Sequence, residues 1–150
     1  MPKLLLFGYG NPGRGDDGLG PELIERITRL QLEDVACQND MQLQIEHVTD
    51  LSEHQQVVFI DADMSCARPF EFSEIYAEKD GSYTSHAMNP AALLYAYQQV
   101  YGKHAPPAYL LRIRGYDFAL GDAISPQASL NLDAATRLVR ELCKAMHPRH

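Results

Sequence analysis

The chain has 150 residues, a length that favours one domain with a single sizeable core, and we expect that domain to span residues 1–150. Its 45% of hydrophobic residues exclude a disordered chain, and its net charge of −7 argues against nucleic acid or an anionic membrane as a partner. No apolar run approaches the ~20 residues of a membrane span or forms a signal-peptide core, so we expect a cytoplasmic protein. The three cysteines are odd in number and lack a CxxC motif, which predicts reduced thiols.

Apolar patterns predict five strands. Residues 3–7 are predicted as a strand because the apolar run of residues 4–7 is typical of a strand buried on both faces of a parallel sheet. Residues 43–47 alternate between apolar and polar positions and predict a half-buried strand, and residues 70–77, which follow a proline, predict an edge strand. The expected strands are residues 3–7, 43–47, 57–60, 70–77 and 108–113.

Apolar spacing predicts one of the longer helices, and a capping pattern predicts the next. Leu23, Ile27 and Leu30 recur at helical spacing in a helix over about residues 20–32. Asn89 and Pro90 are typical of an N-cap followed by proline at the first helical position, and they predict a helix over residues 90–102.

A final helix is expected over residues 127–146, and its apolar face is expected to contain Leu130, Ala135, Leu138, Val139 and Leu142. A short helix is expected within the connection before residue 57. The alternation of strands and helices predicts a three-layer α/β/α sandwich on a mostly parallel, mixed five-stranded sheet with one antiparallel edge strand. Functional sites of such sheets lie at the carboxyl ends of the strands.

The first strand is followed by a loop with six glycines in residues 8–20. A GxGxxG pattern that starts at Gly8 matches a dinucleotide-binding fingerprint, but the following helix begins too late to meet a pyrophosphate. Pro12 removes one amide donor, and the carboxylates of Asp16 and Asp17 would repel phosphates. These features argue against dinucleotide binding.

Three residues with metal-binding side chains follow predicted strands. Taken singly, Asp17 is a helix-capping residue, Asp61 is a turn residue and His86 is a surface histidine. A parallel sheet would bring all three segments to one edge. Two carboxylates and an imidazole would then form an open site for a borderline divalent metal, with positions left for substrate or water.

With these residues in view, the chain resembles the nickel–iron hydrogenase maturation endopeptidases. Residues 7–21, FGYGNPGRGDDGLGP, are similar to the N-terminal signature of the family, and residues 60–62, IDA, to its second motif. Ser85 and His86 before a proline-started helix resemble the third motif, and residues 114–121, RGYDFALG, resemble the closing region. The resemblance covers essentially the whole chain.

The resemblance implies a compact α/β protein, of phosphorylase/hydrolase-like architecture, that removes a C-terminal peptide from a hydrogenase large-subunit precursor after nickel insertion. It implies that Asp17, Asp61 and His86 are the catalytic and metal-contacting residues, with aspartate at position 17 where some members carry glutamate. The nickel would be carried by the precursor, no tightly bound cofactor of the enzyme's own is expected, and the enzyme is expected to be a monomer.

Four further residues lie close to the expected site. Arg14 is a candidate for holding the precursor through a bidentate contact, with a solvated loop charge as the alternative. Asp16 is either a cap or a substrate contact beside Asp17. Asp63 lies two residues beyond Asp61 and is left out of the core site. Cys66 could be mistaken for a nucleophile, but we favour metal recognition over cysteine catalysis.

Two other functions remain open at this stage. One is a self-contained metallohydrolase in which Asp17, Asp61 and His86 hold a zinc ion and act on a small amide or peptide. The other is a non-catalytic module that senses nickel in the precursor. The first predicts stoichiometric zinc in the purified protein, and the second predicts binding without cleavage.

Overall fold

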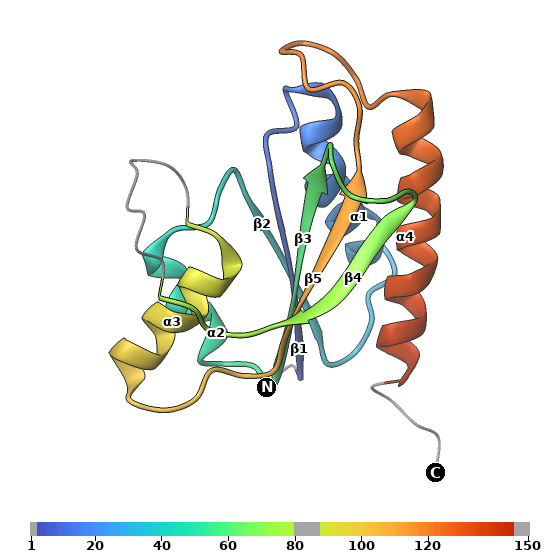
Figure 1. Ribbon diagram of the computed structural model, residues 1–150. Helices are drawn as coiled ribbons and strands as arrows, with labels where there is room; N and C mark the ends of the chain where they lie inside the picture. Colours follow the sequence, from blue (N-terminus) through green and yellow to red (C-terminus); the bar gives the residue numbers. More distant parts are fainter. Residues whose placement is uncertain (1–2, 80–87, 146–150) are drawn as a thin grey trace.

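The computed structural model describes residues 3–79 and 88–145, and their strands form one mixed sheet (Figure 1). The strand order is β2-β1-β3-β5-β4, with β4 antiparallel to β5 and the other neighbours parallel. This confirms the predicted sheet with one antiparallel edge strand. The strands are β1 (Leu4–Tyr9), β2 (Val35–Asp40), β3 (Gln56–Asp63), β4 (Phe70–Ile75) and β5 (Ala108–Arg114).

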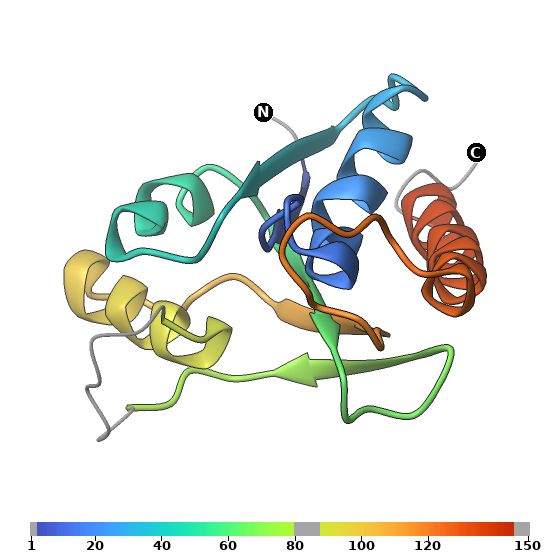
Figure 2. The ribbon, with the colours of Figure 1, turned by 90° about the horizontal axis from the view of Figure 1, so that it is seen from above.

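Helices cover both faces of the sheet, which confirms the three-layer α/β/α architecture. Helices α1 and α4 lie on one face, and α2 and α3 lie on the other (Figure 2). None of the described helices is long and apolar enough to cross a membrane. The helices are α1 (Leu19–Thr28), α2 (Val48–Leu51), α3 (Pro90–Tyr101) and α4 (Pro126–Ala145), and the 3₁₀ helices are η1 (Gly15–Gly18) and η2 (Ile45–His47).

The continuous apolar run of β1 reflects burial on both faces. Leu4 and Leu6 pack with α1 and α4, whereas Leu5 and Phe7 pack with α2 and α3, and all four are buried. Successive side chains of a strand point to opposite faces, so a central strand between two helical layers requires apolar residues at every position.

The predicted caps of α3 are present. The Asn89 side chain accepts a hydrogen bond of 2.8 Å from the Ala92 backbone N–H, and Pro90 is the first helical residue. Gly102 ends the helix in the left-handed conformation, with φ of 65°. These residues satisfy backbone groups that the helix itself leaves free.

The strand predicted over residues 43–47 is wrong, because this segment contains η2, and the strand beside β1 is instead β2. Leu43 and His47 are buried while Ile45 is half exposed, so the alternation reflects one helical turn rather than a pleat. The β2 strand lies at the sheet edge with no fully buried residue, and it therefore lacks an apolar run.

The predicted end of one helix and the predicted apolar face of another also need correction. Helix α1 ends at Thr28 rather than near residue 32, and Leu30 is exposed beyond it. On α4, the predicted Ala135 and Val139 are buried in the face toward the sheet, but the predicted Leu130 is 70% exposed and lies outside that face. That face consists of Ala128, Leu132, Ala135, Val139 and Cys143.

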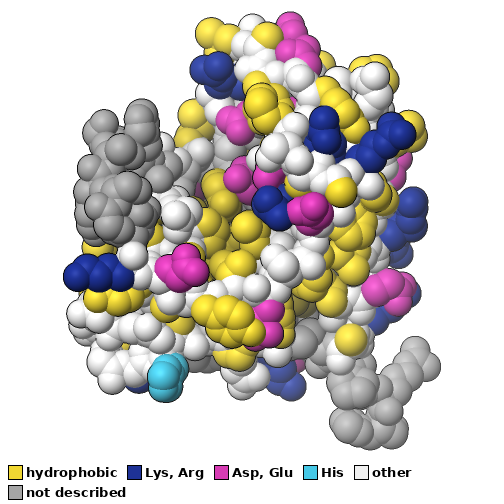
Figure 3. Space-filling view, viewed as in Figure 1, with side chains coloured by type: hydrophobic (Ala, Val, Ile, Leu, Met, Phe, Trp, Pro, Cys, Tyr) yellow, Lys and Arg dark blue, Asp and Glu magenta, His cyan; other side chains and the backbone are white. Residues whose placement is uncertain are grey.

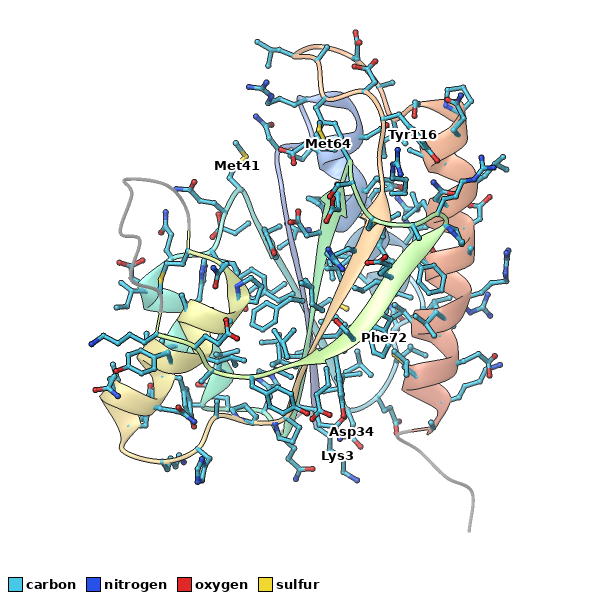
Figure 4. All side chains as sticks on the ribbon, viewed as in Figure 1. Lys3, Asp34, Met41, Met64, Phe72 and Tyr116 are labelled. Atoms are coloured by element: carbon cyan, nitrogen blue, oxygen red, sulfur yellow. The ribbon has the colours of Figure 1, made fainter. Side chains whose placement is uncertain are left out.

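The carboxyl ends of the four parallel strands lie together at the upper end of the sheet in Figure 1, next to η1 and the loop before α4. Lys3 and Asp34 mark the opposite end (Figure 4), where the Lys3 backbone N–H donates to the Asp34 carbonyl at 2.9 Å. The topology thus brings the segments after β1 and β3 to one edge, as expected.

Candidate active site

A sharp glycine turn carries the chain from β1 back to Asp17. Gly10 has φ of 143°, and a Cβ at this position would lie 2.1 Å from the Asp17 carbonyl oxygen. The Asp17 carboxylate accepts a hydrogen bond of 2.8 Å from the Asn11 backbone N–H, and the Asn11 side chain accepts one from Gly13. These contacts hold Asp17 on η1 against the end of β1. Because η1 rather than a long helix follows the glycines, the loop does not form a dinucleotide cradle.

A second close approach brings α1, and with it the η1 segment, next to β3. A Cβ on Gly20 would lie 2.5 Å from the Ile60 carbonyl oxygen and 3.0 Å from the Tyr9 carbonyl oxygen. Only glycine permits the start of α1 to pack this closely on the strand backbones. The consequence is that Asp17, just before α1, lies near Asp61, just after Ile60.

Asp61 lies at the carboxyl end of β3 in a site with excess negative charge. Burial raises the pKa of Asp61 to about 7, and the charges of Asp17 and Asp63 act in the same direction. Hydrogen bonds from the Ala62 backbone N–H and the Tyr9 hydroxyl act in the opposite direction. Two acids that repel one another at a partly buried edge create a position where a cation would be stabilised.

Tyr9 is a site residue that the sequence reasoning missed. Gly8 and Ile60 are register partners, so the next residues, Tyr9 and Asp61, point to the same face, where the Tyr9 hydroxyl donates to the Asp61 carboxylate. Burial and the charge of Asp61 raise the pKa of Tyr9. In the sequence, Tyr9 ends the strand that precedes the glycine loop. Its place beside the predicted ligand Asp61 on the neighbouring strand could have indicated that it contacts Asp61.

Asp16 has a structural position, which favours the cap over the substrate contact as its role. Its side chain is fully buried, and its carboxylate accepts hydrogen bonds from the backbone N–H groups of Tyr116, Asp117 and Ser125 and from the Ser125 hydroxyl. Burial raises the pKa of Asp16, but these hydrogen bonds outweigh it and lower the pKa below its ordinary value. Asp16 therefore ties η1 to the loop before α4.

Arg14 is exposed at the start of η1. Its Nε donates to the Phe118 carbonyl at 3.4 Å, so the side chain lies along the loop before α4. Its contact with a precursor remains a prediction.

A network of charged residues adjoins Asp61 on the same face of the sheet. The Arg112 guanidinium donates to Asp63 at 3.1 Å and also bonds Glu71. Asp61 and Arg112 are register partners, as are Glu71 and Arg112, so β3, β5 and β4 each contribute to this row. Figure 3 shows acidic and basic side chains gathered on the upper part of this face above a hydrophobic area. The sequence reasoning did not single out Arg112, although a charged residue within an apolar strand was a signal.

Cys66 does not have the environment of a nucleophile. It is 3% exposed, and its thiol contacts the carbonyl oxygens of Asp63 and Arg112 at 3.8 and 3.6 Å. Burial raises the pKa of the Cys66 thiol, and the charge of Asp63 adds to this effect. A buried thiol that resists ionisation is a poor nucleophile, which supports the choice of metal recognition over cysteine catalysis.

The third predicted ligand, His86, lies outside the described residues. Within residues 3–79 and 88–145, no group of three His, Cys, Asp or Glu side chains is arranged to hold a metal ion. The described residues supply the two acids, Asp17 and Asp61, and these are oxygen donors of the kind that divalent metals accept.

Solved structures of nickel–iron hydrogenase maturation proteases share this fold. The chain is similar to the maturation protease HycI of Thermococcus kodakarensis KOD1, with a TM-score of 0.75 and 21% identity over 95% of this chain and 93% of that one. It is also similar to the maturating endopeptidase HybD of E. coli, with a TM-score of 0.74 and 16% identity over 97% and 94% of the two chains.

A third similar structure is the hydrogenase 2 maturation peptidase of Thaumarchaeota archaeon SCGC_AB-539-E09, with a TM-score of 0.67 and 20% identity over 93% of this chain and 97% of that one. No family model matches the sequence, and no curated protein matches it. At these identities the structural likeness establishes a shared fold, which confirms the fold that the resemblance implied.

Proposed function

We propose that this chain is an endopeptidase that removes the C-terminal peptide from a nickel-containing precursor of a nickel–iron hydrogenase large subunit. The observation that carries the proposal is the pair of acids, Asp17 and Asp61, brought together at the carboxyl edge of this particular fold. HycI of Thermococcus kodakarensis KOD1 and HybD of E. coli, which share the fold, are by name a maturation protease and a maturating endopeptidase. The resemblance of the quoted sequence motifs to those of the family supports the choice of the same two acids.

In this proposal nickel is part of the substrate. Asp17 and Asp61, together with His86 from the segment outside the described residues, would complete the coordination of a nickel ion that the precursor presents. Carboxylates and a neutral imidazole suit a borderline divalent metal. A precursor without nickel would lack this contact and would be held less tightly, so cleavage would follow metal insertion.

The electrostatics of Asp61 support a cation at this position. Burial and, to a smaller extent, repulsion from Asp17 favour the protonated form of Asp61, and a bound cation would reverse that preference. Cleavage is assigned to Asp17, Asp61 and His86, and the two acids lie at the carboxyl edge of the sheet. We also propose that the enzyme is a monomer, that it acts in the cytoplasm and that it holds no metal ion of its own.

The site is tested by substitution. Asp17→Asn, Asp61→Asn and His86→Ala would each be incubated with nickel-loaded precursor, and trimming would be followed by intact mass. The expected result is a loss of at least about 100-fold in cleavage rate, because a ligand of the recognised metal is removed. The matched control is Asp122→Asn, which neutralises an exposed carboxylate outside the site and should leave the rate unchanged. Wild-type cleavage by Asp61→Asn would contradict the assignment.

A further inference from the structure

One guanidinium beside the candidate active site has no acidic partner. Arg112 and Arg114 are two residues apart at the carboxyl end of β5, so their side chains point to the same face of the sheet. Arg112 binds the carboxylates of Asp63 and Glu71. Arg114 forms no ion pair in the part of the chain that the structure describes, although Asp63 is its register partner. Of these two neighbouring cations, only Arg112 is neutralised by acids of the protein itself.

Neutral groups hold the Arg114 side chain in place. Its Nη1 donates to the Cys66 carbonyl oxygen at 2.8 Å, and its Cζ lies 5.0 Å from the centre of the Tyr116 ring. The Asn131 side-chain amide donates to the Arg114 carbonyl oxygen at 3.0 Å and to the Tyr116 hydroxyl oxygen at 3.2 Å. Figure 4 shows Tyr116 at the upper end of the sheet, where the candidate site lies. A ring and a carbonyl oxygen orient a guanidinium, but they leave its charge without a counter-ion.

Two nitrogen atoms of this half-buried guanidinium have no hydrogen-bond partner. Arg114 Nε is enclosed by protein atoms and donates to no acceptor. Arg114 Nη2 also makes no hydrogen bond within the described residues, but it is not among the enclosed atoms, so a ligand can reach it. A fixed cation with unused donors lowers stability unless an anion binds it. A carboxylate is the anion that best matches the planar guanidinium group.

We propose that Arg114 binds a carboxylate of the precursor close to the cleaved bond. This inference rests on the proposed function and adds a substrate-binding residue to it. Asp61 is the register partner of Arg112, so strand spacing places the Cα atoms of Arg114 and Asp61 about 8 Å apart. An extended precursor segment held at Asp61 would reach the end of the Arg114 side chain within about four residues. An acidic side chain in that segment and the terminal carboxylate of the precursor offer the same chemistry, and the test distinguishes them.

The test is a double-mutant cycle between enzyme and nickel-loaded precursor, with kcat/KM for cleavage as the measured quantity. Each Asp or Glu within about four residues of the cleaved bond is replaced in turn by its amide, and one further precursor carries an amide at its C-terminus. The enzymes are the wild type, Arg114→Gln and Arg140→Gln. The last is the matched control, because it removes an exposed cation of α4 and changes the net charge equally.

One of the amide precursors should lower kcat/KM at least about tenfold for the wild type and for Arg140→Gln, because a charge-assisted hydrogen bond is lost. Arg114→Gln should lose about as much with the unmodified precursor, and the same amide should then cost it less than about twofold. The precursor that shows this coupling identifies the carboxylate as a side chain or as the chain end. Additive losses, or no loss with any amide precursor, would overturn the inference.

Thermal unfolding checks that each variant is folded, and Arg114→Met, which keeps the aliphatic part of the side chain, replaces Arg114→Gln if that variant does not fold. If the wild type binds the precursor without cleaving it, Kd values from calorimetry replace kcat/KM in the same cycle. Coupling in Kd without cleavage would reject only the endopeptidase function, whereas cleavage without coupling would reject only the role of Arg114. A wild type that neither binds nor cleaves the precursor would reject both.

Discussion

The carboxylate of Asp16 lies 2.6 Å from the backbone nitrogen of Ser125 and 2.8 Å from its hydroxyl, although 109 positions separate the two residues. Asp16 is the neighbour of Asp17, and Ser125 immediately precedes α4. This contact fixes η1, which carries Asp17, to the loop before α4. The position of Asp17 therefore depends on a buried charge that is not itself part of the site.

Replacing Asp16 with alanine should destabilise the fold by about 2–4 kcal/mol, because several buried donors would lose their acceptor. Urea unfolding at pH 7 measures the change, and Asp122→Asn, an exposed carboxylate of the same loop, should alter stability by less than about 0.5 kcal/mol. The pKa of Asp16 is lowered on folding, so its contribution is complete above the unfolded pKa of about 4 and declines as the pH falls further. A loss of stability no larger than that of Asp122→Asn would show that these hydrogen bonds do not anchor the loop.

A methyl group at Gly10 should disrupt the loop that places Asp17. The added Cβ would lie 2.1 Å from the Asp17 carbonyl oxygen, so Gly10→Ala should lower stability by at least about 2 kcal/mol and reduce precursor cleavage. Gly121→Ala is the control, because Gly121 also has positive φ, but its added Cβ would meet no atom of the described structure within 4 Å. It should lower stability by only about 1 kcal/mol. Equal effects of the two substitutions would contradict the packing argument.

Asp61 should lower the stability of the wild-type protein at neutral and higher pH. Its folded pKa of about 7 lies above the unfolded value of about 4, so the folded state binds the proton more tightly and loses stability as the pH rises through this range. Asp61→Asn stays neutral, and its stability relative to the wild type should therefore increase by about 1 kcal/mol or more between pH 5 and pH 8. Unfolding by urea at the two pH values is the measurement. A stability difference independent of pH would mean that Asp61 titrates normally.

Cys66 should be dispensable for cleavage. The thiol is buried and its pKa is raised, so Cys66→Ala should process nickel-loaded precursor at a rate within about twofold of the wild type. A stability loss of about 1 kcal/mol is expected from the removal of a buried sulfur atom. Complete loss of processing in a folded Cys66→Ala protein would instead make Cys66 the nucleophile.

Much of the fold could be predicted because its strongest signals are local. The apolar run of β1 and the Asn89–Pro90 start of α3 each depend on a few adjacent residues, and both are present as predicted. The edge strand β2 could not be found in this way, because its pairing with β1 is its main stabilising contact and its burial is only partial. The exposure of Leu130 likewise depends on which face of α4 meets the sheet.

The candidate site was predicted in part for the same reason. Asp17 and Asp61 follow recognisable strands, so topology alone brings them to one edge. The role of Asp16 depends on a contact with Ser125 across 109 positions, and that of Arg112 depends on the register of three strands. Such long-range pairings leave no periodic signal in the sequence.

The most direct test of the central claim compares two preparations of one hydrogenase large-subunit precursor, one loaded with nickel and one free of it, incubated with the purified wild-type protein. Intact mass spectrometry follows the loss of the C-terminal peptide. We expect trimming of the nickel-loaded precursor alone. Equal trimming of the nickel-free precursor would contradict nickel recognition and favour a self-contained hydrolase, and binding of the loaded precursor without trimming would contradict the peptidase assignment and favour a nickel-sensing module.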